Sequence, residues 1–230
     1  MGGEKISVET RCRVLCIGLE DPANGNALDT GMFLGIAAAL GRLEADDDLR
    51  CCVLFASGPE FTRGLDVDSW VESIALPAGS SDPLQLDEAA RVSKPILMAV
   101  QGCCLSVGFE LMLAADIRVA TSDALFAFLS GQASYPGGPS LRLVMEVGWE
   151  IARPYLAGKT MTADEAYSFG IINEVVGSGE QLARVLFLAG RIAESDPALV
   201  ASQVRAFRKG RNDGLKRRLV SSFLRAGETP

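Results

Sequence analysis

The carboxylate of Glu110 lies in the middle of an almost entirely apolar stretch, VQGCCLSVGFELMLAADIRVA, that covers residues 100–120. Burial disfavours the charged form of an acid, so Glu110 would hold a proton more readily than a solvated glutamate and could serve as a general acid or base near neutral pH. The alternative is a structural carboxylate that accepts hydrogen bonds from nearby backbone groups. Gly102 and Gly108, which flank two cysteines in this stretch, indicate turns or close approaches of the backbone.

Histidine is absent from the whole sequence. Ser-His-Asp and Cys-His nucleophile systems need an imidazole to move the proton, and many metal sites need it as a ligand. The sequence also has no CxxC pair, the usual pattern of a thiolate zinc site. Any acid–base chemistry therefore falls to Asp, Glu, Tyr, Cys or Lys, and we expect no metal site.

The composition places the chain among globular proteins. It has 230 residues, 48% of them hydrophobic, and a formal net charge of −7, which argues against nucleic acid as the main partner. No apolar stretch reaches the ~20 residues that a membrane span requires, and residues 1–10 carry no signal-peptide pattern. Six cysteines then indicate free thiols in a reducing compartment. We expect a soluble, cytoplasmic protein without a membrane partner.

Short apolar runs alternate with helical patterns along the chain, which favours an α/β fold with helices packed on a sheet. The predicted strands are 13–19, 50–56, 96–101, 117–120 and 125–128. The predicted helices are 31–45, 141–156, a short helix opened by a capping box at Thr162 and Glu165, then 181–195, 197–209 and 215–226. Turn residues predict surface loops at 76–83 and 131–139.

Four motifs follow one another along the chain: LEDPANGNALD (19–29), FTRGLDV (61–67), the stretch at 100–120, and LAGKTMTADEAYSFGIINEVV (156–176). In this order and spacing they resemble the enoyl-CoA hydratase/isomerase family, also called the crotonase superfamily. The resemblance implies an α/β, crotonase-like fold of repeated ββα units over residues 1–176 and a helical C-terminal region, 177–230, that serves oligomerisation. It also implies a homotrimer or hexamer in fatty acid metabolism, with coenzyme A as part of the acyl-CoA substrate and no tightly bound cofactor.

The resemblance further implies an oxyanion hole made of two backbone N–H groups, which stabilise an enolate formed at the thioester carbonyl. By motif position these are the amides of Leu65, after Gly64, and of Val107, before Gly108. Val107 stands where the family usually has glycine, but a main-chain donor keeps its function whatever side chain it carries. Glu110 matches one of the two catalytic glutamates of the family's hydratases.

The second catalytic glutamate of the family has no counterpart here. The family segment resembling FGxPE corresponds to FAFLS, which places Ser130 at the position of that glutamate. Serine does not act as an unassisted acid at neutral pH, so the two-carboxylate hydration mechanism is incomplete. Asp66 and Tyr135 are the candidates for a replacement partner.

The remaining motif positions correspond to substrate-binding residues, with the nucleotide held mainly by the loops at 21–27 and 61–66. These positions are Ala23, Thr62, Gly64, Asp66, Gly108 and Tyr135. Arg63 and the basic cluster at 205–211 either meet phosphates of coenzyme A or are solvated. Two alternatives stay open: a catalytically silent CoA-binding or scaffold homologue, and a thioester hydrolase, decarboxylase or isomerase on the same fold.

Overall fold

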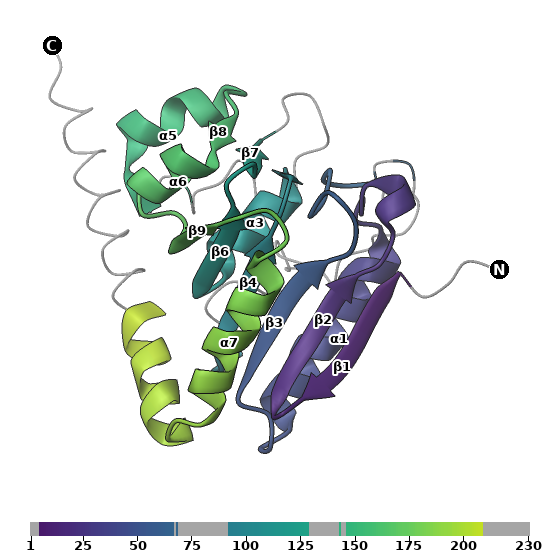
Figure 1. The fold of residues 1–230 in the computed structure, drawn as a ribbon, viewed down its shortest axis with the longest axis vertical. Coiled ribbons are helices and arrows are strands. Elements are labelled where there is room, and N and C mark those ends of the chain that lie inside the picture. Colours follow the sequence, from purple (N-terminus) through teal and green to yellow (C-terminus); the bar gives the residue numbers. More distant parts are fainter. Residues whose placement is uncertain (1–4, 67, 69–91, 129–142, 144–145, 209–230) are drawn as a thin grey trace, which may run out of the picture.

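A computed structural model describes residues 5–66, 68, 92–128, 143 and 146–208. Within them, the central sheet has six strands in the order β1-β2-β3-β4-β6-β9 (Figure 1). The β1–β2 pair is antiparallel, and every other neighbouring pair is parallel. The strands are β1 (Ile6–Arg11), β2 (Val14–Leu19), β3 (Cys51–Ala56), β4 (Ile96–Val100), β6 (Ile117–Thr121) and β9 (Glu174–Val176).

Helices cover both faces of this sheet: α1 (Thr30–Ala45) lies on one face and α7 (Gln181–Ala193) on the other (Figure 1). Successive residues of a strand point to opposite faces, so a strand buried on both sides must be apolar throughout. In β3, Cys52 and Leu54 pack in the cluster that contains α1, whereas Cys51 and Val53 pack in the cluster that contains α7. The continuous apolar runs of the sequence are the consequence of this arrangement.

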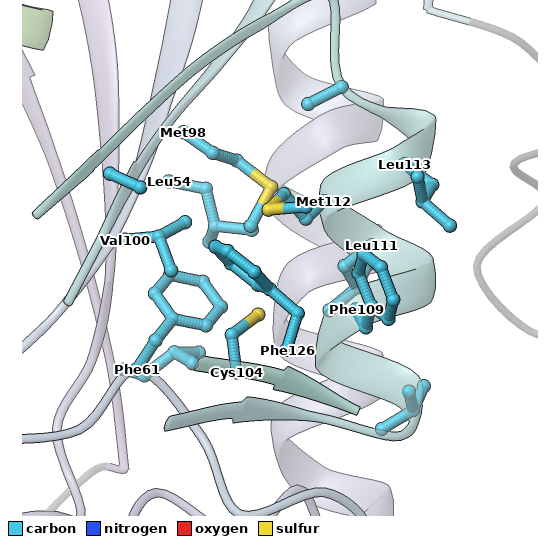
Figure 2. Packing of buried hydrophobic residues seen from close by; sticks show 14 of the residues in the cluster. Leu54, Phe61, Met98, Val100, Cys104, Phe109, Leu111, Met112, Leu113 and Phe126 are labelled. Atoms are coloured by element: carbon cyan, nitrogen blue, oxygen red, sulfur yellow. The ribbon is translucent and has the colours of Figure 1, made fainter. Parts of the chain in front are cut away.

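A second, smaller sheet joins β5 (Cys103–Leu105), β7 (Leu125–Ala127) and β8 (Met161–Thr162), and α3 (Val107–Ala114) follows β5 directly. A dense core lies between α3, this sheet and the central sheet (Figure 2). Phe109 and Phe126, whose ring centroids are 5.5 Å apart, are both fully buried there. Burial of such a side chain contributes about 1.5–3 kcal/mol, so this core anchors the start of α3 firmly. The fully buried or nearly buried residues that Figure 2 labels are Leu54, Phe61, Met98, Val100, Cys104, Phe109, Leu111, Met112, Leu113 and Phe126.

The α/β fold class is confirmed, and most predicted elements occur. The capping box at Thr162 and Glu165 opens α6 (Ala163–Ser168), as expected. Helix α5 (Trp149–Leu156) begins after Gly148, whose φ of 82° is not helical. Residues 197–208 are helical, and η1 (Pro22–Asn24) is a single 3-10 turn. The predicted loops at 76–83 and 131–139 and the predicted helix at 215–226 lie outside the described residues.

Strand β1 was not predicted, because four of its six residues are exposed and it lies at the edge of the sheet.

In the part of the chain that the structure describes, no helix has both the length and the apolarity needed to cross a membrane.

The β1–β2 hairpin offers a stability prediction. Arg11 pairs with Val14, so the loop has two residues, and both Cys12 (φ 47°) and Arg13 (φ 69°) adopt the left-handed conformation. Asn-Gly is strongly preferred in such a turn because both residues tolerate positive φ. We expect the double substitution C12N/R13G to raise the free energy of unfolding by about 1 kcal/mol, measured by urea denaturation. Both side chains are exposed, so the substitution removes no buried contact. An unchanged or lowered urea midpoint would contradict the strain assigned to this turn.

Candidate active site

The first turn of α3 carries backbone donors that the helix itself does not use. The earliest helical hydrogen bond runs from the Glu110 N–H to the Ser106 carbonyl, at 3.2 Å. The N–H groups of Val107, Gly108 and Phe109 therefore have no acceptor within the helix, as in the first turn of any α-helix. The Ser106 side chain does not cap them either. This end of α3 also carries the positive end of the helix dipole, which favours a negatively charged oxygen.

The segment 61–66 lies alongside β5 and so reaches the same end of α3. Its backbone pairs with β5 through Thr62, whose N–H donates to the Cys103 carbonyl (2.9 Å) and whose carbonyl accepts from the Leu105 N–H (3.0 Å). Gly64 then turns the chain with a φ of 105°, a conformation in which a side chain is strained. The turn at Gly64 is thereby fixed relative to the strand that leads into α3.

The N–H of Leu65 points away from the backbone that holds its segment. Leu28 forms an isolated parallel bridge with Leu65, in which the Leu28 N–H donates to the Gly64 carbonyl (2.8 Å) and the Asp66 N–H donates to the Leu28 carbonyl (3.0 Å). In a parallel bridge of this kind the bonds use the neighbours of Leu65, so its own N–H faces the other side. Among the residues that the structure describes, neither the Leu65 N–H nor the Val107 N–H has an acceptor.

Glu110 is 8% exposed and lies in the first turn of α3. It follows Val107 by three residues, so both lie on one face of the helix, less than one turn apart. The structure therefore places the two predicted N–H donors on segments joined by β5, and the predicted acid on the same helix as one donor.

The other predicted site residues differ in how far they are open to a ligand. Ala23 is exposed, in η1, and Asp66 is partly buried. Thr62 is 0% exposed, and its N–H, carbonyl and hydroxyl all bond within the chain. Ser130 and Tyr135 lie outside the described residues.

Most of the chain is similar to known proteins of one family. A family model described as Enoyl-CoA hydratase/isomerase matches residues 9–222. The chain belongs to the enoyl-CoA hydratase/isomerase family. A curated relative, enoyl-CoA hydratase EchA19 of Mycobacterium tuberculosis, is 33% identical over 216 residues, covering 90% of this chain and 81% of the relative. The fold is the crotonase fold, as predicted: a solved probable enoyl-CoA hydratase/isomerase from Mycobacterium abscessus superposes with a TM-score of 0.82 at 36% identity, covering 98% of this chain and 91% of that one.

Curated relatives of this chain carry the names of different reactions. 4-chlorobenzoyl coenzyme A dehalogenase-2 of an Arthrobacter species is 29% identical over 227 residues, covering 92% of this chain and 80% of the relative. The chain is thus an enzyme of the lyase or isomerase type, and its family membership does not determine its exact reaction.

Cysteine is a poor candidate for the acid–base group of this family member. All six cysteines are free, but burial raises the pKa of Cys51 to about 12 and also raises the pKa of Cys104, which lies beside the site. Cys103 is partly exposed, and its pKa is also raised, by burial first and then by the nearby Glu60 carboxylate. A thiol with a raised pKa is neither a thiolate nucleophile nor an effective base at neutral pH. Within the described residues no group of three or more His, Cys, Asp or Glu could hold a metal ion.

Two residues that support the site were missed at the sequence level. Asn26 is 0% exposed; its side-chain amide donates to the carbonyls of Ser57 (2.9 Å) and Glu60 (3.0 Å), while its side-chain oxygen accepts from the Asp21 N–H (2.8 Å). Asparagine commonly holds turns in this way, and that was the available signal. Ser106 has φ 53° and ψ −118°, a region nearly restricted to glycine, and nothing in its side-chain type indicated this.

Proposed function

We propose that the chain processes an acyl-CoA thioester by stabilising an enolate, with the N–H groups of Leu65 and Val107 as the oxyanion hole and Glu110 as the acid–base group. The observation that carries the proposal is the pair of N–H groups without acceptors in the described residues, on two segments held together by β5. The homotrimer or hexamer and the role in fatty acid metabolism that the resemblance implies belong to the same proposal, as does the cytoplasmic location that the composition favours.

The chemistry follows from where charge develops. When a base removes a proton next to the thioester carbonyl, or a nucleophile adds to a conjugated double bond, the electron pair moves onto the carbonyl oxygen. Two fixed N–H donors and the start of α3 stabilise that oxyanion more than the neutral carbonyl, which lowers the barrier. Glu110 takes the proton in one direction and returns it in the other.

Ser130 favours a second candidate, a catalytically silent homologue that binds acyl-CoA. Hydration by two carboxylates needs a second acid, and serine does not supply one. A hydrolase, decarboxylase or isomerase that needs only one acid–base group is compatible with the same residues. Turnover assays with several acyl-CoA thioesters, including a short trans-2-enoyl-CoA, separate these outcomes.

The proposal predicts selective binding of the thioester. We expect an acyl-CoA to bind at least ~10-fold more tightly than the free acid with the same acyl chain, because only the CoA ester reaches the nucleotide loops as well as the two donors. Isothermal titration calorimetry with the two ligands measures this difference. A CoA thioether of the same length, which lacks the carbonyl, is the control for the donors alone. Equal affinity for the ester and the free acid would end the proposal.

A further inference from the structure

The side chain of Thr62 lies between the turn at Gly64 and the start of α3 and touches both. It lies in the segment 61–66 and is 0% exposed. Its backbone is bonded to β5 on both sides, so the side chain has a fixed direction. The hydroxyl and the methyl group of this one side chain meet different parts of the proposed oxyanion hole.

The hydroxyl holds the turn that precedes Leu65. The Thr62 hydroxyl donates to the Asn26 carbonyl at 2.6 Å and accepts from the Gly64 N–H at 3.1 Å. Both bonds are buried, where an unsatisfied donor or acceptor is costly. The next peptide, which carries the Leu65 N–H, is held by its Gly64 carbonyl, which accepts from the Leu28 N–H (2.8 Å), so the peptides on both sides of Gly64 are fixed.

The methyl group sets the approach to α3. A Cβ built on Gly108 would lie only 2.1 Å from the Thr62 Cγ2 methyl carbon, so the two segments are as close as glycine permits. The next contacts of that Cβ, Cys104 Sγ at 3.5 Å and Thr62 Cβ at 3.6 Å, are ordinary van der Waals distances. The Thr62 methyl is thus the part of the side chain that fixes how near Gly108, and with it the adjacent Val107 amide, can come.

The bond from Thr62 also reaches the loop at 21–27. Asn26, whose carbonyl accepts from the Thr62 hydroxyl, is itself tied to the backbone at Ser57 and Glu60. These bonds, all of them between groups of the protein, join the loop at 21–27 and the Gly64 turn into one hydrogen-bonded unit.

We propose that Thr62 is a positioning residue: its hydroxyl orients the Leu65 donor and its methyl sets the distance to the Val107 donor, so that both N–H groups converge on one oxygen. The inference rests on the proposed function, and it adds a role for a side chain that does not itself reach the substrate.

The two halves of the side chain can be removed separately. T62V keeps a methyl and removes the hydroxyl, whereas T62S keeps the hydroxyl and removes the methyl. G108A introduces the clash with the Thr62 methyl, and the double variant T62S/G108A removes that clash again. S57A is the control, because it removes a partly buried hydroxyl bond to the Leu19 carbonyl (3.2 Å) from the neighbouring loop without touching Thr62 or either donor.

The measurements are the absorbance maximum of a bound, conjugated aryl thioester of coenzyme A, kcat and KM, and the melting temperature. Hydrogen bonds to the carbonyl oxygen shift the absorbance of such a probe to longer wavelength, so the shift reports the two donors even without turnover. We expect T62V to lose most of the shift and to lower kcat by roughly 10–100-fold with a smaller change in KM, since donors displaced by ~1 Å act poorly. T62S should lose less than T62V. G108A should abolish the shift, and T62S/G108A should restore much of it.

The outcomes separate the inference from the proposed function. A wild-type protein that binds the probe without any shift overturns the proposed function and, with it, this role. A wild-type shift that T62V retains in full, or a loss in G108A that T62S does not rescue, overturns the positioning role alone. If T62V does not fold, the rescue of G108A by T62S still decides the question. A loss of shift in S57A equal to that in T62V would mean that any loosening of this region suffices, and would also overturn it.

Discussion

Replacement of Glu110 by glutamine is expected to lower turnover of an acyl-CoA substrate by at least ~10²-fold, and by as much as ~10⁴-fold, while the protein stays folded and still binds coenzyme A esters. Glutamine has nearly the same shape but cannot exchange a proton at neutral pH. Glu110 is 8% exposed, so the amide fills the same buried space in the first turn of α3. Steady-state kinetics, calorimetric binding of the acyl-CoA and thermal unfolding, measured together, test this expectation.

A matched control distinguishes catalysis from structure. Asp116 is also a partly buried carboxylate, but it accepts from the Ile96 N–H (2.9 Å) and pairs with Arg208, beyond the C-terminal end of α3. D116N should lower the melting temperature and leave kcat nearly unchanged, because it leaves a buried guanidinium with a weaker partner. E110Q should show the opposite result. A lower melting temperature with unchanged kcat in E110Q would instead identify Glu110 as a structural carboxylate.

The sequence predicted those elements whose burial forces a simple pattern. Strands β2, β3 and β4 lie inside the sheet, so both of their faces must be apolar. The apolar runs at 13–19, 50–56 and 96–101 therefore predicted them. Strand β1 escaped because it is an edge strand with four exposed residues, and its pairing depends on the β1–β2 turn rather than on its own composition. Helix α3 has seven of its eight residues buried, so its sequence is as continuously apolar as that of a buried strand and shows no amphipathic pattern.

The site was predictable only as far as local spacing determines it. The interval from Val107 to Glu110 places both on one helical face whatever the rest of the fold does. The contacts of Thr62, by contrast, reach residues 36 positions back and 46 positions ahead in the chain, at Asn26 and Gly108. The spacing of apolar residues along the sequence does not indicate contacts between residues so far apart. The positive φ of Ser106 is likewise imposed by the tight path from β5 into α3, not by the serine.

The backbone donor of Val107 can itself be removed by substitution. Val107 is the first residue of α3, and it is 1% exposed. Proline is favoured at this helix position, where its missing N–H would have no helical partner and its fixed φ suits the helix. Because Ser106 has φ 53° and precedes the new proline, the change is made together with S106G, which permits that conformation.

We expect S106G/V107P to lower kcat by ~10²–10³-fold relative to S106G alone, the usual cost of losing one donor of an oxyanion hole. The control is S106G/V107A, which trims the same side chain but keeps the N–H. If the donor matters, the alanine variant stays within about ten-fold of S106G, and the proline variant alone loses the wavelength shift of the bound aryl thioester. If the bulk of Val107 matters instead, the two variants change together, because both remove the branched side chain. Equal rates in the proline and alanine variants, with both melting temperatures near that of S106G, would exclude the Val107 N–H from the oxyanion hole and leave Leu65 as its only proposed donor.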